Sequence, residues 1–278
     1  MIAHAGVLPG GRRAWLYRVG LIEEDVAMGE PARLAAAVSW LFVPASRPER
    51  FEKAMASGAD AVVIDLEDAV PPADKPLARE KLTAHWPRPE SGSGPELVVR
   101  VNDLRSAESA EDLAACRELA PTAVVLPKTE SADDVRAAAE ASGRPVLALV
   151  ETARGLIGLP DIAAADETVR LLFGNIDLAL DLGVTADAAL DAARSDLVRW
   201  SAASGLPQPV DGVTTAISDP AAVTRAAETA LAWGFGGKLC IHPSQLPLVA
   251  AAFAPTEEEL AWAGRILDAV DGEDTGAV

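Results

Sequence analysis

The chain has 278 residues, a mass of 28.8 kDa and a formal net charge of −18 at pH 7. Half of its residues are hydrophobic and 24% are charged, which excludes disordered, collagen-like and small disulfide-rich proteins. The acidic excess argues against binding to a nucleic-acid backbone. Two cysteines without CxxC spacing predict a cytoplasmic protein, and no apolar stretch reaches the roughly 18 residues of a membrane helix.

Residues 1–38 precede the first regular pattern in the chain. Three arginines stand ahead of apolar patches in this segment, but Glu23, Glu24 and Asp25 interrupt any core of a signal peptide. We therefore predict that residues 1–38 are an N-terminal extension.

From Ser39 onward, short apolar runs alternate with longer segments of helical period. The predicted strands are Trp40–Val43, Ala61–Leu66, Leu97–Val101, Ala123–Pro127, Val146–Val150, Arg170–Phe173, Pro209–Val213 and Lys238–Ile241. The predicted helices that follow them are Pro48–Ser57, Pro76–Trp86, Ala110–Leu119, Ala132–Ala141, Leu159–Ala165, Ala188–Ser204, Pro220–Trp233 and Gln245–Ala252. Eight βα units in this length predict a (β/α)₈ TIM barrel over residues 39–255.

A last helix, Thr256–Val270, is predicted in the segment 256–278, because Thr256 and Glu259 have the spacing of a capping box. A doubly wound open sheet is the alternative architecture. It has little support, since no GxGxxG motif opens any predicted helix.

Ionisable residues end seven of the eight predicted strands, where a barrel gathers its chemistry. They are Asp65, Glu67 and Asp68, then Arg100, Lys128, Glu151, Asp177, Asp211 and His242. Each one alone could be a solvated loop charge or a helix cap. Together they predict a site at one mouth of the barrel.

Carboxylates from adjacent strands suit Mg²⁺, which takes one or two carboxylates and leaves its other positions to water and substrate. The three histidines are scattered along the chain, so a zinc site is disfavoured. An arginine beside such a metal can clamp a carboxylate. These residues therefore predict a site for a 2-oxo acid bound through Mg²⁺.

Nucleophilic catalysis has weaker support. No GxSxG elbow occurs, and Cys240 lies in an apolar strand, where we expect it to be a core residue. Lys128 could in principle form a Schiff base. A metal-bearing mouth makes that unnecessary, so we interpret Lys128 as an electrostatic or structural residue that helps to bind the substrate.

Six ordered stretches resemble the citrate lyase beta-subunit family of the HpcH/HpaI aldolase and citrate lyase superfamily, which also contains malyl-CoA lyases. They are LFVPASRPERFEKAMASGADAVVIDLEDAV, VVRVN, VVLPKTES, LALVETARGL, LLFGNIDLALDLG and GFGGKLCIHPSQ, and they cover Ser39 to about Gln245. The resemblance implies a TIM barrel that forms a homotrimer or larger homo-oligomer. It also implies an Mg²⁺-dependent enzyme that reversibly cleaves a CoA thioester to acetyl-CoA and a 2-oxo acid such as oxaloacetate.

The resemblance assigns roles to individual residues. Glu151 and Asp177 match the metal ligands. Arg100 matches the arginine that binds the substrate carboxylate, and Glu67 with Asp68 matches an acidic pair that holds metal-bound water or orients the arginine. The segment Phe173–Asn175, with Gly174 and Asn175, is implied to approach the oxo acid through backbone N–H groups.

Two departures from the family pattern matter. The chain stops at Gly276–Val278, where the family begins a lid segment that carries an aspartate acid, so either the chain is truncated or the enzyme lacks this lid and its aspartate. Pro44–Ala45 replaces the usual Pro-Gly and could narrow the entrance. A malyl-CoA thioesterase, an aldolase acting on a free oxo acid and a non-autonomous subunit of a carrier-protein-dependent lyase complex stay open as alternatives.

Overall fold

The computed structural model describes residues 30–88, 94–262 and 265. Most of the predicted N-terminal extension and the predicted start of a lid at Gly276–Val278 lie outside the described residues. The predicted last helix is helical over its described part, 257–262 and 265, and Thr256 and Glu259 form the predicted capping box at its start. None of the helices in the described ranges is long and apolar enough to cross a bilayer.

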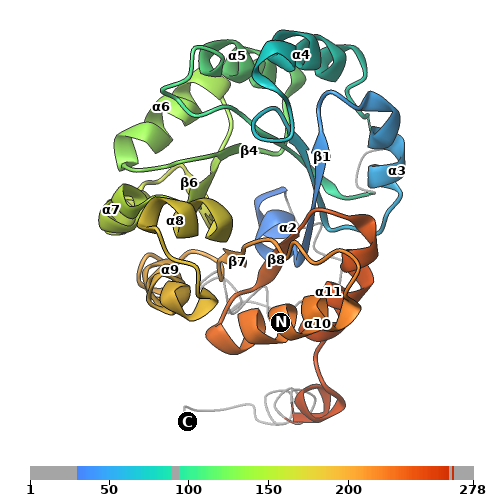
Figure 1. Ribbon diagram of the computed structural model, residues 1–278, viewed down its shortest axis with the longest axis vertical. Helices are drawn as coiled ribbons and strands as arrows, with labels where there is room; N and C mark the ends of the chain where they lie inside the picture. Colours follow the sequence, from blue (N-terminus) through green and yellow to red (C-terminus); the bar gives the residue numbers. More distant parts are fainter. Residues whose placement is uncertain (1–29, 89–93, 263–264, 266–278) are drawn as a thin grey trace, which may run out of the picture.

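The eight predicted strands are all present and pair in parallel, in chain order, as a closed barrel (Figure 1). The last pairing, between the first and eighth strands, closes the ring. The strands are β1 (Ser39–Pro44), β2 (Ala61–Asp65), β3 (Glu96–Arg100), β4 (Ala123–Leu126), β5 (Val146–Val150), β6 (Thr168–Phe173), β7 (Val210–Asp211) and β8 (Gly237–Cys240). The predicted TIM barrel is confirmed.

Helices surround the strands (Figure 1). They are α3 (Phe51–Met55), α4 (Lys75–Ala84), α5 (Ser109–Leu119), α6 (Ala132–Ser142), α7 (Ala153–Ala164), α8 (Asn175–Leu182), α9 (Asp191–Ala203), α10 (Pro220–Trp233) and α11 (Leu246–Phe253). Short 3₁₀ turns η2 (Pro48–Arg50), η3 (Pro72–Asp74), η4 (Asp187–Leu190) and η5 (Pro243–Gln245) precede four of them.

Two of the helices that surround the strands differ clearly from the sequence prediction. The helix α7 begins six residues before the predicted Leu159, because the Thr152 side chain accepts a hydrogen bond from the Gly155 N–H and caps it. The helix α8 was not predicted at all. Its only buried residue is Leu178, and Leu180 is 79% exposed, so its apolar residues do not form the stripe that marks a packed helix.

The core has two layers, because side chains of a strand alternate between the inside and the outside of the barrel. The inner layer includes Trp40, Val63, Val98, Leu149 and Leu239. A larger layer fills the space between the strands and the ring of helices, and Cys240 belongs to it. Strand residues that stand two positions beyond the inner layer therefore reach the carboxyl-terminal mouth.

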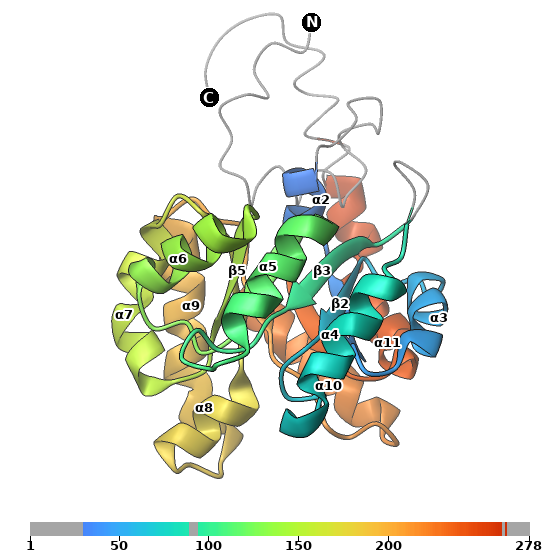
Figure 2. The same cartoon turned by 90° about the horizontal axis from the view of Figure 1, so that it is seen from above.

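The amino-terminal end of the barrel is covered by a helix that no sequence pattern indicated, α2 (Glu30–Ala36). Figure 2 shows α2 and α8 at opposite ends of the barrel. The fully buried Arg170 of β6 ties α2 to the strands: its Nη1 donates to the Leu34 and Ala37 carbonyls at 2.9 and 2.7 Å, and its Nε donates to the Gln208 carbonyl at 2.7 Å. This end is therefore structural, and the opposite end is open for chemistry.

We expect Arg170→Leu to lower the free energy of unfolding by about 3 kcal/mol, because three buried carbonyls lose their donor. Urea denaturation measures the change. The matched control is Arg199→Leu on α9, since Arg199 is 63% exposed and should change stability by only about 0.5 kcal/mol. A loss below about 1 kcal/mol for Arg170→Leu would contradict this role for the arginine.

Candidate functional site

The carboxyl-terminal mouth is organised around the contact between Asp65 and Arg100. These residues end β2 and β3 and are direct register partners, so both side chains point inward. The Arg100 Nε and Nη2 donate to the two oxygens of Asp65, each at 2.7 Å. A bidentate pair of this kind fixes the plane of the guanidinium. The Phe42 ring lies 4.9 Å from the guanidinium carbon and supports its face.

Two further carboxylates surround the remaining nitrogen of Arg100. Its Nη1 lies 3.0 Å from Glu67 Oε2 and 3.4 Å from Asp68 Oδ2. Burial alone would lower the pKa of Arg100, but the neighbouring Asp65 charge outweighs it and the pKa is raised. The guanidinium is thus permanently charged and rigidly held.

Asp65 is ionised in spite of being buried. Burial acts to raise its pKa, but the charge and hydrogen bonds of Arg100 outweigh this effect and hold the pKa below its usual value. The backbone N–H groups of Glu67 and Ala69 also donate to its carboxylate, at 2.9 and 3.0 Å. The same contacts shape the turn after β2, so Asp65 positions both Arg100 and the acidic pair. Asp65 is visible in the sequence at this strand end, but no motif predicted a role for it.

Arg100 and the three carboxylates around it form a group that we call the Arg100 cluster. Lys128 connects this cluster to Glu151. Its ammonium donates to Glu67 Oε1 at 2.8 Å, and its backbone N–H donates to Glu151 Oε1 at 2.9 Å. The backbone of Lys128 is left-handed, with φ 47°, which turns this N–H toward Glu151. A left-handed residue other than glycine is strained, and such strain is common at functional sites.

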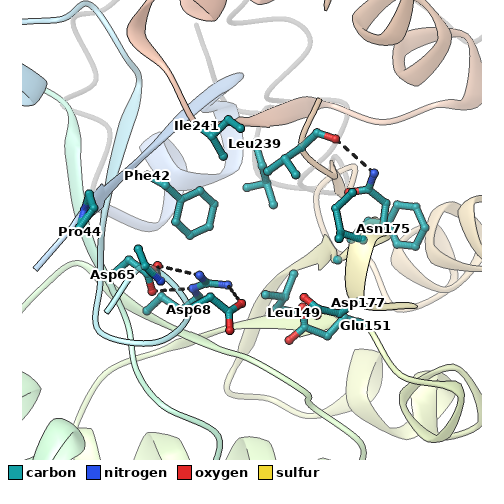
Figure 3. A pocket seen from close by; sticks show the side chains of 16 residues that line it. Phe42, Pro44, Asp65, Asp68, Leu149, Glu151, Asn175, Asp177, Leu239 and Ile241 are labelled. Carbon is teal, nitrogen blue, oxygen red and sulfur yellow. Dashed lines mark hydrogen bonds and ion pairs between the residues drawn. The ribbon is translucent and has the colours of Figure 1, made fainter. Parts of the chain in front are cut away.

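Glu151 and Asp177 lie together on the other side of the mouth (Figure 3). Glu151 follows β5 and is almost fully buried, whereas Asp177 stands in the first turn of α8. Burial, and the nearby charges of Glu67 and Asp177, raise the pKa of Glu151 to about 8. A Cβ at Gly174 would overlap the Glu151 carboxylate, so only glycine fits there. Among the described residues, no basic side chain lies between these two crowded carboxylates. A bound cation would therefore be favourable there.

A cavity of about 420 Å³ lies between the Arg100 cluster and the Glu151 and Asp177 pair (Figure 3). Of the predicted site residues, the cavity is lined by Asp68, Arg100, Glu151, Gly174, Asn175 and Asp177. Glu67 and Lys128 are paired behind Arg100 and are not among the lining residues. The roles assigned to all eight residues stay predictions.

The resemblance implied that backbone N–H groups of Phe173–Asn175 approach the oxo acid, but one of these N–H groups is already bonded within the barrel. The Gly174 N–H already donates to the Val150 carbonyl at 3.0 Å. The helix has no side-chain cap among the described residues, so the N–H groups from Asn175 onward are available. Asn175 itself is held by the loop after β7, because its Nδ2 donates to the Val213 carbonyl at 3.2 Å.

Three other ionisable residues in or after β7 and β8 do not line the cavity. Lys238 and Asp211 face the helices, and the Lys238 ammonium donates to Asp211 Oδ2 at 2.6 Å and to the Gly212 carbonyl at 2.7 Å. His242 caps the turn η5 through Ser244. Ala45 is buried with the outer core and does not line the cavity, so the substitution at the Pro-Gly position does not narrow it.

The donor set fits magnesium better than a transition metal. Among the described residues, no three His, Cys, Asp or Glu side chains come together as a metal cluster. Mg²⁺ needs no such cluster, because it binds through one or two carboxylates and keeps waters or substrate oxygens as its other ligands. Glu151 and Asp177 are the pair that lines the cavity on the side facing away from Arg100.

The chain is similar in sequence to one protein family and to several known proteins. The family model described as HpcH/HpaI aldolase/citrate lyase matches residues 38–243. A citrate lyase subunit beta-like protein of Mycobacterium tuberculosis is 44% identical over 246 residues, which are 86% of this chain and 87% of the relative. A (3S)-malyl-CoA thioesterase of Cereibacter sphaeroides is 34% identical over 84% of this chain and 82% of its own length. Human mitochondrial citramalyl-CoA lyase is 30% identical over 82% and 74%.

Solved structures agree with these relatives. CitE of M. tuberculosis in complex with magnesium, acetoacetate and coenzyme A has a TM-score of 0.74 and 42% identity, and the match covers 88% of this chain and 91% of that one. The citrate lyase beta subunit of the same organism, complexed with oxaloacetate and magnesium, has a TM-score of 0.71 and 42% identity over 80% and 100%.

We expect Lys128→Gly to be more stable than Lys128→Ala by about 1 kcal/mol, because both lose the ion pair with Glu67 but only glycine relieves the left-handed backbone. Urea denaturation of the two variants measures the difference. An alanine variant as stable as the glycine variant would show that the positive φ of Lys128 carries no strain.

We expect neither thiol of the native protein to react with Ellman's reagent at pH 8. Burial raises the pKa of Cys240 to about 12 and also raises that of Cys116, so neither forms a thiolate. Both should react after unfolding in urea. A thiol that reacts rapidly in the folded protein would reopen nucleophilic catalysis by cysteine.

Proposed function

Because this chain belongs to the HpcH/HpaI aldolase/citrate lyase family, we propose that it is an Mg²⁺-dependent carbon–carbon lyase. The substrate is a 3-hydroxyacyl-CoA thioester of the citryl-CoA or malyl-CoA type, and the products are acetyl-CoA and a 2-oxo acid. The observation that carries the proposal is the cavity itself, which sets a fixed guanidinium on one side and two crowded carboxylates on the other.

Glu151 and Asp177 are the residues that would hold the metal ion. Mg²⁺ bound there supplies a Lewis acid for the hydroxyl and carboxylate oxygens of the substrate. The solved relatives contain magnesium together with oxo acids, which supports a magnesium-dependent function. The Lys128 N–H donates to one oxygen of Glu151, so the other oxygen, beside Gly174, would be the one left to hold the ion.

The remaining residues bind and orient the substrate. The free N–H groups at the start of α8 would donate to oxo-acid oxygens, and the positive end of the helix favours an anion there. Arg100 provides a fixed positive charge that would stabilise the negative charge developing on the substrate during the reaction. Asp65 and Glu67 are buried and keep the guanidinium in place. Asp68 contacts the guanidinium from the exposed edge of the cavity.

The chemistry is a retro-Claisen cleavage. A base takes the proton of the 3-hydroxyl group, the bond between C2 and C3 breaks, and C3 becomes the carbonyl of the oxo acid. The electron pair of the broken bond moves into the thioester enolate, which takes up a proton to become acetyl-CoA. Arg100 stabilises the charge that develops in this step, as preorganised cations do in other active sites.

A malyl-CoA thioesterase is the second candidate, supported by the relative of that name at 34% identity. A non-autonomous subunit of a carrier-protein-dependent complex is a third. The three differ in products: a lyase releases oxo acid and acetyl-CoA without free thiol, a thioesterase releases free thiol without oxo acid, and a dependent subunit turns over free CoA thioesters poorly. A cytoplasmic homotrimer or larger homo-oligomer stays a prediction.

We expect Arg100→Ala and Asp177→Ala each to lower kcat by about 10³-fold or more on citramalyl-, malyl- or citryl-CoA, because each removes charge stabilisation that the cleavage needs. Separate assays of oxo acid and free thiol follow the reaction. The matched control is Arg136→Ala on α6, whose side chain is 57% exposed, and it should keep wild-type activity.

Circular dichroism checks that the two variants remain folded. Retained Mg²⁺-dependent cleavage in both would refute the assignment, and so would release of free thiol as the main product in the wild type.

A further inference from the structure

The charges in the cavity are arranged unevenly. Four carboxylates line it, and Arg100 is its only cation among the described residues. Two nitrogens of Arg100 are already bound to Asp65, and the third faces Glu67 and Asp68. A bound divalent ion would neutralise Glu151 and Asp177, so no positive charge would be left over for a second anionic group of the substrate.

One wall of the cavity, formed by β1, β8 and the residues just after β7 and β8, is apolar. Phe42, Val213, Leu239 and Ile241 line it, and we call these four residues the apolar wall. Figure 3 shows Phe42, Leu239 and Ile241 across the cavity from Glu151 and Asp177. The wall is continuous because β8 pairs directly with β1 and closes the barrel there.

Nearby cations are turned away from this wall. The Lys238 ammonium is 3% exposed and lies on the outer side of β8, bound to Asp211 and the Gly212 carbonyl. Lys128 is bound to Glu67. Neither can reach the apolar wall without leaving a buried carboxylate unpaired, which is strongly unfavourable.

We propose that the apolar wall makes this enzyme selective for an oxo acid with one carboxylate and an apolar group on its carbonyl carbon. The inference rests on the proposed function. When the carboxylate and carbonyl oxygens face the metal side, the remaining substituent of the carbonyl carbon faces the apolar wall. A methyl group is buried there favourably, whereas the second carboxylate of oxaloacetate would be buried without a partner.

Binding in the presence of Mg²⁺ tests this selectivity without relying on turnover. Isothermal titration of the full chain compares pyruvate, freshly dissolved oxaloacetate and 4-methyl-2-oxopentanoate, whose branched end has the shape of the second carboxylate without its charge. We expect oxaloacetate to bind at least about 100-fold more weakly than pyruvate, as for a site that leaves a polar group unpaired. The uncharged analogue should bind more tightly than oxaloacetate.

A charge introduced into the apolar wall should reverse the selectivity. Ile241 is 38% exposed, so Ile241→Arg can be accommodated at the rim. We expect this variant to bind oxaloacetate at least about tenfold more tightly than the wild type does, since the new guanidinium pairs with the second carboxylate. The matched control is Ile217→Arg, because Ile217 is 42% exposed and does not line the cavity.

The possible outcomes distinguish a failure of the selectivity proposal from a failure of the proposed function. Equal affinity of the wild type for pyruvate and oxaloacetate would overturn the selectivity proposal and leave the proposed function standing. A folded Ile241→Arg variant that binds oxaloacetate no better than Ile217→Arg would also overturn it. Failure of the wild type to bind any of the three acids with Mg²⁺ would refute the proposed function itself.

Discussion

The bidentate pair between Asp65 and Arg100 is the contact on which the mouth of the barrel depends. The register of β2 and β3 places the two residues opposite each other at the last inward position of each strand. The pair keeps both groups charged in a buried place, since the attraction outweighs the cost of burial for Asp65. Because Asp65 also accepts two backbone N–H groups, the same carboxylate shapes the turn that carries Glu67 and Asp68.

On the other side of the mouth, Glu151 and Asp177 have no basic side chain between them among the described residues. Burial raises the pKa of Glu151 to about 8, and Asp177 and Glu67 add to the effect. Lys128 links the halves, with its ammonium on Glu67 and its N–H on Glu151. Among the described residues that line the cavity, the basic side chain lies on the arginine side and two carboxylates lie on the other, which is the arrangement expected of a magnesium enzyme for anionic substrates.

The fold was largely predictable from the sequence. Buried parallel strands are short apolar runs, and residues typical of turns stand between them. The helices were less so. The prediction began α7 at Leu159 and left out the stretch with Gly155 and Gly158, yet both glycines pack against carbonyls of Thr129 and Glu130 in the loop after β4, where a Cβ would clash. The helix α8 has exposed apolar residues and no amphipathic stripe, so its period gave no signal.

The candidate site was predictable in composition but not in orientation. Ionisable residues at strand ends marked Arg100, Glu151 and Asp177 correctly as neighbours of one cavity. The same pattern also marked Asp211, which points outward because alternate residues of a strand face opposite sides. Asp65 was visible in the sequence, but its register with Arg100 appears only in three dimensions.

The central claim is that Glu151 and Asp177 bind a divalent cation beside the fixed Arg100. Anomalous diffraction from crystals grown with Mn²⁺ and pyruvate locates such an ion directly. The account predicts one anomalous peak in contact with both carboxylates, with the pyruvate carboxylate and carbonyl oxygens completing its coordination. A cavity without a peak, or an ion bound elsewhere while pyruvate occupies the cavity, would contradict it.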